Sequence, residues 1–261
     1  MKRTSPWSLA IIACALACAC GATEVSDQAK RKSDRFYEAA VIAWREERDN
    51  LRAIRHLTQS VRENPGNDAA HYLLGTIYLG RQELELAEEH LRKAVELRGP
   101  TRPAARAEAL NSLGVLLIQR GKHTEAVEAL REAAEEVLNR EPWLALGNLG
   151  WAYIELGQLD DAIAVLKRSL FDQPMFCVGL YRLGQAHYLK GEHEEAEKRL
   201  RSAVAVPEVG CSEMQEAHQL LGMCYLRMGK DDKARSSLER CRDLAPESET
   251  GETCSEALEG F

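Results

Sequence analysis

The sequence predicts an all-α protein made of six tandem helical hairpins, because of its composition and of a pattern that recurs along the chain. Leucine, alanine and glutamate, which favour helices, are abundant, and strand-forming residues do not gather in alternating runs. Leu-Gly pairs recur five times at spacings of 34 to 39 residues. Such self-similarity predicts an array of stacked units rather than a single globular core.

The recurring pattern has three parts in a fixed register. An alanine lies 12 residues after the glycine of each Leu-Gly pair, and a leucine lies four residues further on. The glycine on the first helix and the alanine on the second let the two backbones approach closely, while the leucine fills the seam around them. The glycines are Gly75, Gly114, Gly150, Gly184 and Gly222; the alanines are Ala87, Ala126, Ala162, Ala196 and Ala234; the leucines are Leu91, Leu130, Leu166, Leu200 and Leu238.

The pattern resembles the tetratricopeptide repeat (TPR) family, whose unit of about 34 residues also carries an aromatic ring and a closing proline. A tyrosine lies three residues after the glycine in three copies, as Tyr78, Tyr153 and Tyr225, and Pro174 and Pro246 close two units. The resemblance implies a right-handed superhelix in which the first helix of each hairpin lines a concave groove.

The expected units occupy residues 34–67, 68–101, 107–140, 143–176, 177–210 and 215–248. The first is the weakest copy, because Ala40 and Val41 replace the Leu-Gly pair, although Ala53 and Leu57 keep their register. Terminal repeats often depart from a pattern in this way. Residues 249–261 are expected to form a short capping helix or a frayed tail.

Residues 1–20 predict an export signal. Lys2 and Arg3 precede an apolar stretch of about nine residues, which is too short to span a bilayer and suits a signal peptide. The polar residues 21–33 are then expected to form a tether between the end of this signal and the folded repeats.

The end of this signal resembles the processing site of bacterial lipoproteins. Small residues surround three cysteines, of which Cys20 fits the lipidated position best, while Cys18 and Cys14 stay as alternatives. By the same resemblance, Gly21 after the modified cysteine implies transport to the outer membrane. Cleavage and release without a lipid is the other interpretation.

The TPR resemblance also predicts which side chains face the groove. They are a mixture of aromatic rings and amides, which suits protein recognition, since rings offer contact area and amides bind peptide backbone. Each of them could instead pack on the neighbouring repeat. The basic clamp by which some TPR proteins hold a C-terminal carboxylate is not expected, since the fifth position of the units carries no lysine. The groove residues are Tyr72, Thr76, Asn111, Val115, Asn148, Trp151, Tyr181, Gln185, Tyr188 and Met223.

Five cysteines follow the signal region, and an exported chain can oxidise them. Cys177 and Cys211 stand at the starts of neighbouring units, which lie side by side, so a disulfide between them is predicted. Cys241 could reach Cys254 if the tail folds back, which would leave Cys224 buried and free. The alternative is that several of them are small core residues. Their spacing does not suit a zinc site, and no metal or cofactor is expected.

The net charge and the absence of known catalytic motifs reduce the number of functions to be considered. The formal net charge of −7 disfavours nucleic acid as a partner. The sequence contains none of the common phosphate-binding, nucleophile or zinc-protease motifs, so we expect no catalytic activity. The histidines are scattered, and the paired glutamates suit solvated helix faces.

The combination of a lipoprotein signal, a tether and six TPR units resembles the pilotin lipoproteins of type IV pilus systems, the PilF/PilW/Tgl type. This resemblance implies an outer-membrane lipoprotein, monomeric before it binds its partner, that helps secretin subunits multimerise and is required for twitching-type motility. Two other functions stay open: a TPR scaffold of outer-membrane protein assembly or cell-wall machinery, and an accessory or regulator of a periplasmic enzyme.

Overall fold

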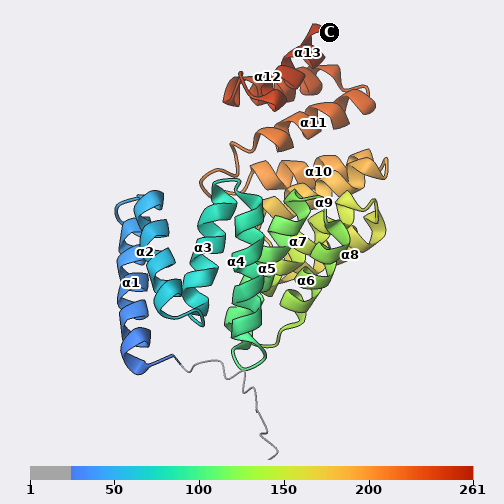
Figure 1. Ribbon diagram of the computed structural model, residues 1–261. Helices are drawn as coiled ribbons and strands as arrows, with labels where there is room; N and C mark the ends of the chain where they lie inside the picture. Colours follow the sequence, from blue (N-terminus) through green and yellow to red (C-terminus); the bar gives the residue numbers. More distant parts are fainter. Residues whose placement is uncertain (1–24, 261) are drawn as a thin grey trace, which may run out of the picture.

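The computed structural model describes residues 25–260, which form thirteen helices and no strand (Figure 1). The helices are α1 (Asp27–Arg45), α2 (Asn50–Glu63), α3 (Asp68–Gly80), α4 (Leu84–Arg98), α5 (Pro103–Gln119), α6 (His123–Glu135), α7 (Pro142–Glu155), α8 (Leu159–Asp172), α9 (Cys177–Leu189), α10 (His193–Val204), α11 (Gln215–Arg227), α12 (Asp231–Leu244) and α13 (Glu249–Glu259).

The first twelve helices form six hairpins that follow one another along the array (Figure 1). Each odd-numbered helix up to α11 packs most extensively on the even-numbered helix after it, and each hairpin packs on the next. Helix α13 closes the end of the array by packing on α12 and α11. The all-α superhelix of six hairpins predicted from the sequence is confirmed.

The glycine seams explain why the hairpins close so tightly. A Cβ added at any of the five Leu-Gly glycines would lie 2.4 to 2.6 Å from Cγ of the leucine that follows it in the pattern. Those five leucines and the five alanines of the pattern are all fully buried. Backbone contact at glycine therefore sets the distance between the two helices of a hairpin.

The hydrophobic core runs along the array as linked clusters. The largest extends from α4 to α9, and smaller clusters fill the first hairpin, the junction of α9 with the loop before α11, and the last hairpins. Each hairpin thus buries its apolar residues partly against its neighbours, as expected of a repeat protein.

The first hairpin begins earlier than the sequence pattern indicated. Helix α1 starts at Asp27, after an N-cap at Ser26 whose side chain accepts a hydrogen bond from the N–H of Ala29, so the tether expected over residues 21–33 is wrong from Asp27 onward. Among the seven extra residues, Ser33 packs through hydrogen bonds: it is fully buried, and its Oγ lies 2.9 Å from both O and Oγ of Ser60. Such polar packing leaves no apolar period in the sequence.

The other hairpins lie close to their expected ranges. Helices α3, α9 and α11 begin at the expected residues, α7 begins one residue early, and α5 begins at Pro103, four residues before its expected start. Proline suits the first turn of a helix, because no N–H partner is needed there. Of the two forms expected for the last residues, the structure has a helix, α13.

The signal peptide and the lipidation site at Cys20 lie outside the described residues. Within residues 25–260, none of the helices combines the length and the apolar character required to cross a bilayer.

A concave face as the candidate functional site

The odd-numbered helices form the inner layer of the array. Neighbouring first helices contact one another from α3 to α11, whereas the second helices of neighbouring hairpins make no comparable contact within residues 25–260. The first helices therefore lie closer together than the second helices, which curves the array and makes their side concave. All ten predicted groove residues lie on α3, α5, α7, α9 and α11, and each is half-buried.

One part of this face is a small polar cavity between α3, α5 and α7. It has a volume of ≈ 210 Å³, and Tyr72, Asn111 and Ser112 help to line it. Tyr72 Oη lies 3.4 Å from Ser112 Oγ, and Asn148 Nδ2 donates to Asn111 Oδ1 at 2.9 Å. Two of the predicted groove residues thus line a cavity that can exchange hydrogen bonds with a peptide, and a third, Asn148, is bonded to one of them.

A second part lies on α7 and α9 and is aromatic. The Arg182 guanidinium carbon lies 4.4 Å from the centroid of the Trp151 ring and 5.2 Å from that of Tyr181. Arg182 Nη1 donates to Gln185 Oε1 at 3.0 Å, and Trp151 Nε1 donates to Glu155 Oε1 at 2.9 Å. Trp151, Tyr181 and Gln185, all predicted from the sequence, therefore share one cluster.

Two other predicted groove residues also bond or pack within their own hairpin. Thr76 Oγ1 donates to the carbonyl of Tyr72, one turn earlier on α3. The Tyr188 ring lies 5.4 Å from the ring of His193, on the partner helix α10. Their positions fit the packing alternative as well as the groove interpretation. Val115 and Met223 are half-buried on α5 and α11.

Arg182 is the residue that sequence reasoning missed. It occupies the sixth position of the fifth unit, as the predicted groove residue Asn148 does in the fourth unit, so the register could have identified it. Burial lowers the pKa of Arg182 and raises the pKa of Tyr181. An arginine remains protonated in proteins, so the cluster keeps its positive charge.

The cysteine pairings expected from the sequence are present. Cys177 and Cys211 form a disulfide with a Cα–Cα distance of 5.9 Å, and Cys241 and Cys254 form one with a distance of 6.2 Å. Cys224 is free and buried, and burial raises the pKa of its thiol to about 12. The first disulfide ties the start of α9 to the loop before α11, and the second ties α13 to α12.

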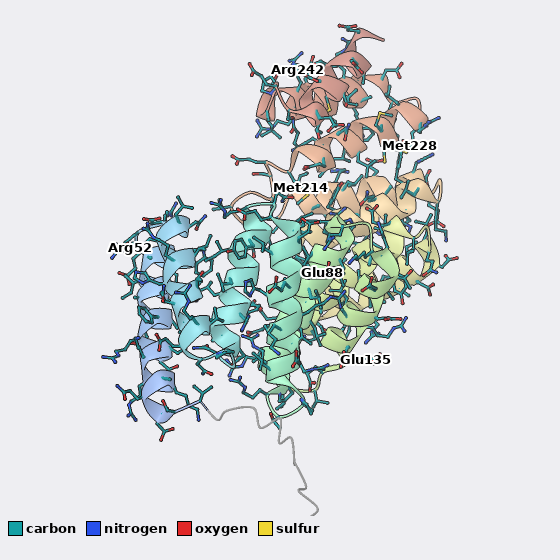
Figure 2. The ribbon with its side chains drawn as sticks, viewed as in Figure 1. Arg52, Glu88, Glu135, Met214, Met228 and Arg242 are labelled. Carbon is teal, nitrogen blue, oxygen red and sulfur yellow. A yellow bond between two sulfur atoms is a disulfide. The ribbon has the colours of Figure 1, made fainter. Side chains whose placement is uncertain are left out.

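The outer surface offers charged groups that neutralise one another. Glu88 of α4, labelled in Figure 2, is buried and lies within ion-pair distance of Arg92, Arg120 and Lys122. Hydrogen bonds from Lys122 and Arg92 outweigh burial and hold the pKa of Glu88 below its usual value. These charges tie α4 to the turn between α5 and α6 and suit packing.

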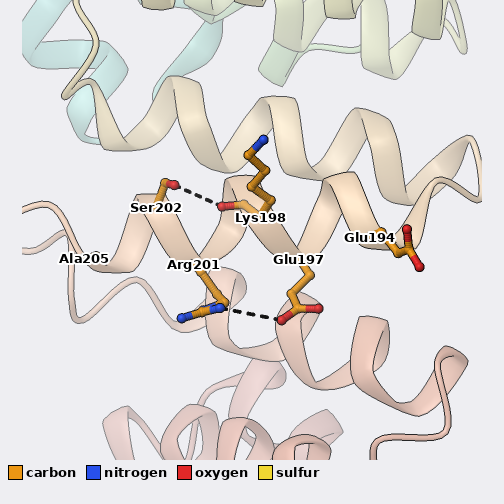
Figure 3. Close-up of a pocket in the computed structure, with 6 residues that line it drawn as sticks. All are labelled: Glu194, Glu197, Lys198, Arg201, Ser202 and Ala205. Carbon is orange, nitrogen blue, oxygen red and sulfur yellow. Dashed lines mark hydrogen bonds and ion pairs between the residues drawn. The ribbon is translucent and has the colours of Figure 1, made fainter.

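A surface pocket of ≈ 480 Å³ lies along α10 (Figure 3). In it, Arg201 pairs with Glu197 at 3.8 Å, and Ser202 Oγ donates to the backbone carbonyl of Lys198. These polar groups bond to one another along one helix, and they are not arranged around a shared ligand position. Within residues 25–260, no three His, Cys, Asp or Glu side chains gather as metal ligands would.

Known proteins share the repeats. Four family models, each described as tetratricopeptide repeat, match residues 67–135, 117–175, 148–210 and 215–248. Together they span more than half of the chain, and their matched ranges take in five of the six hairpins.

Curated relatives match at lower identity. The BBSome complex member BBS4 homolog of Drosophila melanogaster is 22% identical over 224 residues, which is 85% of this chain and 43% of that protein. The type IV pilus assembly protein PilF of Pseudomonas aeruginosa is 26% identical over 114 residues, or 44% of this chain and 43% of that protein. The matches thus span less than half the length of either relative.

Two solved structures share most of the described architecture. PilW, described as a widely conserved type IV pilus biogenesis factor, superposes with a TM-score of 0.73 and 23% identity, over 85% of this chain and 97% of PilW. Pseudomonas aeruginosa PilF superposes with a TM-score of 0.69 and 19% identity, over 88% of this chain and 99% of PilF. The chain belongs to the tetratricopeptide repeat family, and its fold is similar to that of the type IV pilus proteins PilW and PilF.

Proposed function

We propose that this protein is a lipid-anchored, non-catalytic binding protein on the periplasmic side of the outer membrane, where it helps secretin subunits of a type IV pilus system to multimerise. The observation that supports this most strongly is the similarity in fold to PilW and PilF, two proteins of type IV pilus biogenesis and assembly, over 85% and 88% of the chain. The lipoprotein-like processing site at Cys20 supports the location.

The mechanism requires no chemical step. The concave face offers aromatic rings and amides to an extended segment of a partner, and the anchor confines the complex to the membrane surface. Confinement raises the local concentration of bound subunits and so favours their assembly. If the bound segment is unfolded in the free partner, binding also covers apolar surface that would otherwise aggregate.

The test is a deletion strain in which secretin multimers are followed on a heat-resistant gel. We expect the multimers to be lost on deletion and restored by the wild-type gene. A Cys20→Ala variant, expressed at equal level, should restore them poorly because it lacks the anchor. Normal multimers in the deletion strain would refute the secretin proposal. Normal multimers with defective insertion of outer-membrane barrels would favour the scaffold of barrel assembly instead.

A further inference from the structure

One cation on the concave face, Arg182, has no carboxylate within ion-pair distance in the described chain. Another arginine that stacks on an aromatic ring, Arg98, does have a carboxylate at that distance. The Arg98 guanidinium carbon lies 4.3 Å from the centroid of the Tyr72 ring, and its Nε also pairs with Asp68 at 3.0 Å. Arg182 stacks on aromatic rings in the same way without such an acid.

The guanidinium of Arg182 is held in place by neutral groups. Trp151 and Tyr181 contact it through their rings, and Gln185 accepts one N–H at 3.0 Å. A guanidinium has five N–H donors arranged as a planar fork that matches a carboxylate. The other donors of Arg182 have no protein acceptor in residues 25–260, so its orientation is fixed while most of its bonding capacity is unused.

The electrostatic surroundings favour an incoming anion. Burial lowers the pKa of Arg182, because it removes water that would stabilise the cation. The carboxylates of Glu155 and Glu216 attract the cation from a distance but do not offset this loss. Arg182 is half-buried, and a carboxylate that docks directly on its unused donors would form charge-assisted hydrogen bonds, which are the stronger ones. Lysine or arginine side chains of a partner would be repelled at the same point.

The inner layer continues past Arg182 onto α11, where Met223 is half-buried. A bound segment can therefore run on beyond Arg182 toward the last hairpin, which suits a carboxylate in the middle of a segment and does not require a chain end. We infer that Arg182 binds the carboxylate of an aspartate or glutamate side chain within an extended segment of the partner protein. This inference deepens the proposed function, since it names the chemistry recognised on the same concave face.

The experiment uses the full chain in detergent and three immobilised libraries of seven-residue peptides. The first has glutamate fixed at the centre and both ends blocked, the second has glutamine there instead, and the third has the central glutamine with a free C-terminal carboxylate; all other positions are randomised. Retained protein is measured for the wild type and for Arg182→Gln, Arg182→Lys and Arg168→Gln. Arg168 is exposed on the outer helix α8, so its variant is a control for the loss of one positive charge.

We expect the wild type and Arg168→Gln to bind the glutamate library about tenfold more strongly than the blocked glutamine library, because bonds to a charged group are the stronger ones. Arg182→Gln should lose this preference. Arg182→Lys should weaken it, since lysine keeps the charge without the fork, and this variant decides the matter if circular dichroism shows that the glutamine variant is unfolded.

Equal retention of the glutamate and blocked glutamine libraries, including no retention of either, would overturn the inference, as would an unchanged preference in both Arg182 variants. Retention of the free-carboxylate library alone would assign the site to a chain end and overturn it as well. These results are independent of the deletion strain. A missing glutamate preference beside secretin multimers that depend on the protein removes only this inference. A clear preference beside normal multimers in the deletion strain removes only the secretin proposal.

Discussion

Replacement of Gly150 by alanine tests whether glycine seams set the geometry of the array. Gly150 lies on α7 and faces α8, and an added Cβ would lie 2.4 Å from Leu166 Cγ and 2.7 and 2.9 Å from its two methyl carbons. Carbon atoms in contact prefer separations of about 3.5 to 4.0 Å. Leu166 is fully buried and has no open space to enter, so the two helices would have to move apart by about 1 Å.

The net loss of stability follows from two opposing effects. Overpacking of a filled core costs roughly 1–3 kcal/mol. Alanine in a helix is favoured over glycine by about 1 kcal/mol, which offsets part of that cost. We therefore expect Gly150→Ala to lower the free energy of unfolding by up to about 2 kcal/mol, equivalent to a fall in Tm of up to roughly 8 °C for a chain of this size.

The assay is thermal and urea unfolding followed by circular dichroism at 222 nm, with Gly80→Ala as the matched control. Gly80 is also helical, and a Cβ there would have no neighbour within 4 Å, so the control should be neutral or slightly stabilising. Leu166→Ala alone should cost about 2–5 kcal/mol. In the double variant the new methyl group enters the space that Leu166 leaves, so the combined loss should be smaller than the sum. If Gly150→Ala behaves like Gly80→Ala, or the two losses simply add, the seam argument is wrong.

Three further predictions concern the turn after α3, a histidine pair and a disulfide. Gln82 has a φ of 61°, a left-handed conformation that favours glycine, and four of the later hairpins have glycine at the same place. Gln82→Gly should therefore raise the urea midpoint by the equivalent of about 0.5–1 kcal/mol. An unchanged or lower midpoint would contradict this. His71 Nδ1 and His90 Nδ1 lie 2.9 Å apart, and burial lowers the pKa of both rings. As the pH falls, the unfolded chain binds protons before the folded chain does, so the free energy of unfolding should be highest above pH 6.5 and should fall as the pH drops below that value. His90→Phe should make this dependence on pH weaker in urea titrations between about pH 7 and pH 5. An unchanged dependence on pH would refute the prediction. Removal of the Cys177–Cys211 disulfide by a double alanine variant should cost about 3–4 kcal/mol for a loop of 34 residues, and a loss below about 1 kcal/mol in thermal unfolding would contradict the loop-closure estimate.

The parts of the fold that the sequence predicts are those held by apolar contacts at fixed spacing. Gly114 and Leu130, for example, meet across a hairpin 16 residues apart, and the same spacing recurs in four other hairpins. The disulfide between Cys177 and Cys211 was also predictable, because one repeat length separates the two residues and places them at matching points of neighbouring units.

The start of α1 was not predictable from the same pattern. Its first turns are held by Ser33, which accepts a hydrogen bond from Asn67 Nδ2 at 2.9 Å and contacts Ser60, and by an ion pair from Lys32 to Glu63 at 2.6 Å. Polar side chains in a helix carry no periodic signal unless their partners are known. Ser60 and Glu63 lie on α2 and Asn67 caps α3, about 30 residues further along the chain, so only the folded structure reveals these partners.

The bonding state of the groove residues could not be predicted either, and it decides which of them are available to a partner. Asn148 donates to Asn111, and Trp151 donates to Glu155, so a peptide that bonds to these groups must exchange one hydrogen bond for another. Such exchanges contribute little net free energy. The net gain of binding must then come from burial of the rings and from the donors of Arg182 that have no protein acceptor in residues 25–260. It follows that affinity on this face depends mainly on the apolar and acidic residues of the partner, and that the amides serve to align its backbone.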